Sequence, residues 1–76
     1  MPYEHYSMVI TWSVRDQAFL VSFPEWEGKV NTPATHGATY EEAAQRGHEA
    51  LADLVQLWQE QGWELPAPRM FATLEQ

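Results

Sequence analysis

Residues 6–13 alternate between two kinds of side chain and predict a β-strand, because successive strand residues point to opposite faces. One side of this strand would be mostly apolar and the other more polar, with Tyr6, Met8, Ile10 and Trp12 on the first and Ser7, Val9, Thr11 and Ser13 on the second. Residues 14–17 form a polar break without glycine, and residues 18–23 resume a pattern rich in aromatic and β-branched side chains. The two segments together predict a β-hairpin.

Pro24 ends the second predicted strand, because proline lacks the N–H group that a sheet ladder needs. Residues 25–29 follow as an acidic loop around Trp26 and Gly28. The candidate for a short third strand is residues 30–35, which Pro33 either confines to a sheet edge or shortens.

A long helix is predicted to begin at Thr39. Its hydroxyl can accept a hydrogen bond from the backbone of Glu42, whose carboxylate can reach back, and this arrangement is a capping box. Apolar residues then share one arc of a helical wheel: Tyr40, Ala43, Ala44, Gly47, Ala50, Leu51, Leu54, Val55, Leu57 and Trp58. The first half of this arc is small, so we expect the helix to lie close to a sheet at Gly47, which otherwise costs about 1 kcal/mol relative to alanine.

Gly62 is placed to end the helix in the left-handed conformation, and Pro66 and Pro68 prevent a restart. Residues 69–74 then predict a last strand. The sequence therefore predicts one α+β domain over residues 1–76, a small antiparallel sheet with one helix packed on one face, in the order β-β-β-α-β. Such a sheet leaves a face and two edges uncovered, so we expect a homodimer, a higher homo-oligomer or a partner to cover one of them.

Composition narrows the function classes. The chain has 76 residues, 45% of them hydrophobic with four Trp, which is enough for one packed core. It has no cysteine, which excludes disulfides, thiol nucleophiles and cysteine zinc sites. A net charge of -7 makes nucleic acid a poor direct partner and a basic protein a better one. We expect a cytoplasmic protein without membrane contact, since neither a signal peptide nor a long apolar run is visible.

Catalytic and metal-binding patterns are not visible in the sequence. His5, His36 and His48 lack the spacing of a metal site on one helical face, and no serine lies in a GxSxG turn. We therefore expect no metal, no cofactor, no catalytic residue and no enzyme activity. A small hydrolase would need a buried carboxylate or histidine that the sequence does not reveal.

Acidic residues offer the best candidates for binding. The outer face of the predicted helix carries Glu42, Gln45, Glu49, Asp53, Gln56 and Glu60, with Arg46 as the helix's only cation. This face is either ordinary solvated surface or a stripe that steers a basic partner. Trp26, between Glu25 and Glu27, is either an interface anchor or a lid folded over the sheet edge. The candidate partner-binding residues are Glu25, Trp26, Glu27, Glu49 and Asp53.

Three motifs in this order resemble the HicB-like antitoxin family. They are FPEWEG at residues 23–28, GATYEEA at residues 37–43, and Gly62 followed by Pro66 and Pro68. The resemblance covers the family's partner-binding domain, and we expect this chain to lack the DNA-binding module that full-length members commonly append. It implies an antitoxin domain that binds a small basic HicA-like toxin, an mRNA-cleaving ribonuclease, and covers its RNA-binding surface.

Two functions stay open at this point. In the first, carboxylates of an antitoxin-like module occupy cationic sites of the toxin, while an apolar anchor such as Trp26 supplies desolvated contact. In the second, the chain is a structural or regulatory oligomer of the same fold that has no toxin partner.

Overall fold

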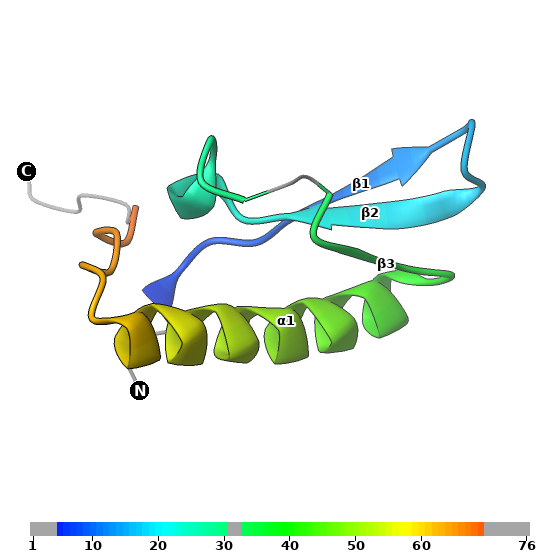
Figure 1. Ribbon diagram of the computed structural model, residues 1–76. Coiled ribbons are helices and arrows are strands. Elements are labelled where there is room, and N and C mark those ends of the chain that lie inside the picture. Colours follow the sequence, from blue (N-terminus) through cyan, green and yellow to red (C-terminus); the bar gives the residue numbers. More distant parts are fainter. Residues whose placement is uncertain (1–4, 31–32, 70–76) are drawn as a thin grey trace, which may run out of the picture.

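The computed structural model describes residues 5–30 and 33–69. Three antiparallel strands form one sheet in the order β1-β2-β3, and a single long helix, α1, lies along one face of it (Figure 1). The elements are β1 (Val9–Ser13), β2 (Ala18–Ser22), the 3-10 helix η2 (Pro24–Trp26), β3 (Thr35–Gly37) and α1 (Tyr40–Gln61). The predicted α+β class and the β-β-β-α order are confirmed. The predicted last strand, residues 69–74, lies outside the described residues except for Arg69.

The predicted hairpin is present, with shorter strands than expected. The β1–β2 register places Ile10 opposite Val21 and Trp12 opposite Phe19, so these side chains share one face. Extending that register would put Ser7 opposite Pro24, which has no N–H to donate, and this is why β1 begins at Val9.

The β1–β2 turn is held by its own polar side chains. The Ser13 hydroxyl donates to Asp16 Oδ2 at 2.8 Å and accepts from the Asp16 amide at 3.2 Å. Gln17 closes the turn in the left-handed region, with φ of 53°, and its side-chain amide donates to the Val14 carbonyl at 2.6 Å. A non-glycine residue therefore occupies a conformation that glycine adopts without steric cost.

The predicted third strand is wrong in position, because β3 covers Thr35–Gly37 instead of residues 30–35. Pro33 has no N–H to donate to β2, and the next residue, Ala34, donates its amide to the Val21 carbonyl at 2.8 Å. The strand ends at Gly37, where a Cβ atom would lie 2.5 Å from the backbone nitrogen of Ala43. Glycine at this position lets β3 and the start of α1 approach each other closely.

Both predicted ends of α1 are confirmed. Thr39 caps the helix by accepting from the Glu42 amide at 3.0 Å, and the Glu42 carboxylate reaches back to the amide of Ala38 at 2.6 Å. Gly62 ends the helix with φ of 73°. Although α1 has 22 residues, no helix in the described parts of the chain is both long and apolar enough to cross a membrane.

Close contact between α1 and the sheet is also confirmed at Gly47. A Cβ atom there would lie 2.7 Å from Met8 Sδ and 3.0 Å from Val21 Cγ1. The buried core joins both layers and consists of Val21, Phe23, Trp26, Ala43, Leu51, Val55 and Trp58. The apolar arc was predicted too wide, because the sheet is narrow and leaves Tyr40, Ala44 and Leu57 exposed.

Candidate protein-binding surface

Trp26 is a core residue, so its prediction as an exposed interface anchor is wrong. Its side chain is 0% exposed and packs edge-on against Tyr6 and Trp58, with ring centroids 4.6 and 5.9 Å away. The η2 turn produces this placement, because it redirects the chain after Phe23 and turns the indole inward. No aromatic ring at this position is left for a partner to bury.

Glu25 is also buried, at 5% exposure, which contradicts its prediction as a carboxylate that faces a partner. The Ser7 amide donates to both of its oxygens, at 3.1 and 3.0 Å, and the Arg69 amide donates to Oε2 at 2.9 Å. Burial alone raises the pKa of Glu25, but these amide donors outweigh it and hold the pKa below its ordinary value. We call these three residues the Glu25 clamp, because they join the N-terminal segment, η2 and the segment after α1.

The hydroxyl of Tyr6 strengthens the same junction by donating to the Pro66 carbonyl at 2.6 Å. Burial, together with the nearby charge of Glu25, raises the pKa of this phenol, so it remains a donor. The segment after α1 therefore runs back toward η2 (Figure 1). Glu25 in the acidic loop thus connects three segments of the fold by hydrogen bonds and is not available to a partner.

The other three candidate residues are exposed, and the structure brings two of them together. Glu49 and Asp53 lie one turn apart on α1, whereas Glu27 lines a separate hollow beside Val9 and Pro24. Like charges at this helical spacing cost a few tenths of a kcal/mol, about 0.2–0.5. Within residues 5–30 and 33–69, no hydrogen bond or ion pair compensates Glu49 or Asp53.

We call the stripe that contains them the acidic ridge, formed on α1 by Glu42, Glu49, Asp53 and Glu60. Arg46 lies within it and pairs with Glu42 at 3.3 Å, while also donating to the His36 carbonyl at 3.4 Å. This pairing neutralises the beginning of the ridge. Glu60 accepts a hydrogen bond from the Gln56 side-chain amide at 3.1 Å. Within the described residues, Glu49 and Asp53 are therefore the ridge carboxylates that have neither a hydrogen bond nor an ion pair.

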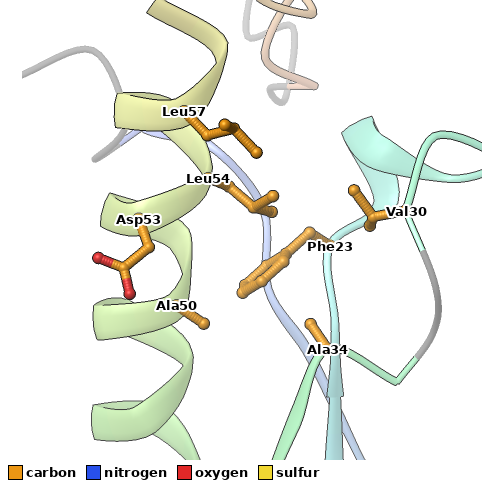
Figure 2. Close-up of a pocket in the computed structure, with 7 residues that line it drawn as sticks. All are labelled: Phe23, Val30, Ala34, Ala50, Asp53, Leu54 and Leu57. Carbon is orange, nitrogen blue, oxygen red and sulfur yellow. The ribbon is translucent and has the colours of Figure 1, made fainter. Parts of the chain in front are cut away.

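An open apolar groove of about 300 Å³ runs beside the acidic ridge. It is lined by Phe23, Val30, Ala34, Ala50, Asp53, Leu54 and Leu57. Figure 2 shows the helical side chains at 50, 54 and 57 pointing across the groove toward Phe23, with the Asp53 carboxylate on the rim, turned away from that ring. Asp53 thus belongs both to the ridge and to the groove.

The groove was missed from the sequence, where its three apolar helical residues were assigned to the buried arc. The sequence did contain a sign of the groove. At 100° per residue, Leu57 in the apolar arc lies only 40° from Asp53 in the charged stripe. An apolar arc that comes so close to a charged stripe is wider than a three-stranded sheet can cover. Leu57 is accordingly 41% exposed.

Aromatic side chains form a second exposed apolar feature, at the hairpin end of the sheet. Trp12, Phe19 and Tyr40 follow one another with ring centroids 4.9 and 4.3 Å apart. Trp12 is 45% exposed and Tyr40 is 64% exposed. We call these three residues the aromatic row.

Among the residues that the structure describes, no group of three or more histidine and carboxylate side chains is placed to hold a metal ion. Glu25 is the buried carboxylate among these described residues, and the amides of Ser7 and Arg69 donate to its oxygens. Comparisons of the chain with protein-family models, with curated proteins and with solved structures found no match.

Proposed function

We propose that this chain is an antitoxin-like binding module of the HicB-like kind, which neutralises a small basic, mRNA-cleaving toxin by covering its RNA-binding surface. The observation that carries the proposal is the uncompensated charge of Glu49 and Asp53 on the exposed face of α1, in a chain of net charge -7. A surface of this kind repels nucleic acid and attracts a basic protein. The proposal implies a cytoplasmic location, where mRNA is found.

Inhibition would work by competition for cationic sites. A ribonuclease holds RNA phosphates with lysine and arginine side chains, and carboxylates on a rigid helix can occupy the same positions. The Glu25 clamp contributes indirectly, because it fixes the segments at both ends of the fold around Trp26. Glu49 and Asp53 are then the contact residues, with Glu27 on a separate part of the surface.

The test is a pull-down at low salt with the tagged full chain, followed by mass spectrometry and an assay of RNA cleavage by the eluted partner. We expect a small basic ribonuclease whose activity the chain suppresses. Charge reversal by Glu49→Lys and Asp53→Lys together should lower the association rate constant by about tenfold or more. The matched control is Glu27→Lys with Glu64→Lys, which changes the net charge equally at exposed positions away from the ridge. Binding that is indifferent to salt and to both variants would refute the proposal.

The aromatic row favours a second candidate, a structural or regulatory oligomer without a toxin. Exposed aromatic rings in contact with one another are typical of surfaces that become buried when two protein molecules associate. Under this alternative the molar mass in light scattering rises with concentration, and Trp12→Lys abolishes the rise. A monomer at every concentration would eliminate it.

A further inference from the structure

Beyond the acidic ridge, the groove beside it has a chemistry that specifies an occupant. Its walls come from α1 on one side and from Phe23, Val30 and Ala34 on the other, and all but Asp53 are apolar (Figure 2). Leu57 keeps 41% of its surface in water at the mouth. Covering such a surface is favourable at roughly 25 cal/mol per Å² of apolar area.

The size of the groove suits a side chain better than a cofactor. At about 300 Å³ it lies at the lower end of the range of small-molecule pockets. Protein interfaces commonly insert one aromatic or aliphatic anchor into a pocket of the partner and surround it with polar contacts. At the groove this chain provides the pocket, so the side chain that fills it comes from the partner.

Charge decides which kind of segment carries that anchor. Asp53 stands on the rim, Glu49 lies one turn before it, and neither has a compensating cation in the described residues. An acidic segment would be repelled here, and a neutral one would leave both carboxylates partly desolvated and unpaired. A second copy of this chain is a poor occupant, because it carries only four Lys and Arg against eleven Asp and Glu.

We infer that the groove receives a leucine-like side chain from a basic, amphipathic segment of a protein partner, whose flanking lysine or arginine residues pair with Asp53 and Glu49. This inference deepens the proposed function and rests on its claim that the partner is a basic protein. Under this inference the partner provides the apolar side chain, and the groove between α1 and the residues around Phe23 receives it.

The test titrates the isotope-labelled full chain by NMR with a nine-residue peptide of leucines flanked by lysine and arginine. Two matched peptides carry serine in place of leucine, or glutamate in place of the basic residues. We expect changes in the chemical shifts of the backbone amides around Ala50 and Leu57 with the first peptide only. Equal binding of the serine peptide, or shifts confined to other surfaces, would overturn the inference.

Ala50→Leu fills the groove with a good helix former, and Ala44→Leu makes the same change at an exposed position on another side of α1. The first variant should weaken peptide binding by about tenfold, as expected when an anchor loses its pocket, and the second should leave it unchanged. Should Ala50→Leu disturb the fold, Leu57→Ser replaces it, because it removes apolar surface from the 41% exposed mouth of the groove without changing the charge. Unchanged affinity in the folded groove variants contradicts the inference.

Failure of the two proposals is distinguishable. If the captured ribonuclease binds the groove variants as tightly as the original chain, the groove inference fails and the antitoxin-like function stands. If the leucine peptide binds in the groove but no basic ribonuclease is recovered, the antitoxin-like function fails and the groove remains a site for basic amphipathic segments.

Discussion

Glu25→Gln is the most informative single substitution, because it removes one charge and changes the shape of the side chain very little. In the folded protein the carboxylate accepts from the amides of Ser7 and Arg69 through contacts of 2.9–3.1 Å. A glutamine can present only one oxygen, so its NH2 group faces a donor or one amide loses its acceptor. A hydrogen bond to a charged group contributes about 1.5–3 kcal/mol, and a buried unsatisfied donor costs a similar amount.

We therefore expect Glu25→Gln to lower the free energy of unfolding by about 1–3 kcal/mol at neutral pH, measured by urea denaturation. The exposed neighbour Glu27 provides the matched control, and Glu27→Gln should change stability by less than about 0.5 kcal/mol. Hydrogen exchange at the Ser7 and Arg69 amides should accelerate in the first variant only.

The pH dependence provides a second readout of the same reasoning. The folded pKa of Glu25 lies below its ordinary value of 4.5, so the ionised form is favoured by folding. The resulting stability is fully present above pH 4.5 and is lost as the pH falls through the lowered folded pKa. The difference between the original chain and Glu25→Gln should shrink over that range. A difference that is equal at neutral and acidic pH, or equal effects of the two glutamine variants, would refute the reasoning.

Substitutions at three further positions test the packing and the turns. Gly47→Leu should cost about 1–3 kcal/mol by overpacking against Met8 and Val21, and a higher melting temperature would contradict the close contact. Thr39→Ala should cost about 1 kcal/mol in urea denaturation through loss of the helix cap, whereas Thr39→Ser should not. Gln17→Val should destabilise the hairpin by about 1–2 kcal/mol in urea denaturation, because a β-branched residue is strained at a φ of 53° and cannot replace the hydrogen bond to the Val14 carbonyl.

Local chemistry explains what the sequence could predict. A hydroxyl three residues before a glutamate, and a glycine before two prolines, define the ends of α1 without reference to the rest of the chain. Small residues at one helical face likewise predicted the approach at Gly47. Each of these signals lies within one or two turns of the chain, so it is visible without knowing which distant residues, such as Met8 and Val21 at Gly47, the segment contacts.

The acidic loop was misjudged because its environment is created by distant residues. Glu25 receives its donors from positions 18 and 44 residues away, and Trp26 meets its ring partners at Tyr6 and Trp58. An isolated aromatic between two glutamates has the composition of an exposed anchor, and nothing nearby contradicts that interpretation. Only the folded arrangement reveals that the backbone supplies enough amides to bury the charge.

The groove and the close helix contact share one origin. Near its beginning α1 carries Ala43 and Gly47 against the sheet, whereas its second half carries Leu54, Leu57 and Trp58. A straight helix with small residues at one end and large ones at the other diverges from the surface on which it packs. Trp26 fills the centre of that divergence, and the side next to Phe23 remains open. A substitution that lifts the helix at Gly47 should therefore alter the groove as well, so weaker peptide binding by Gly47→Leu would link the packing of the core directly to the surface that the partner uses.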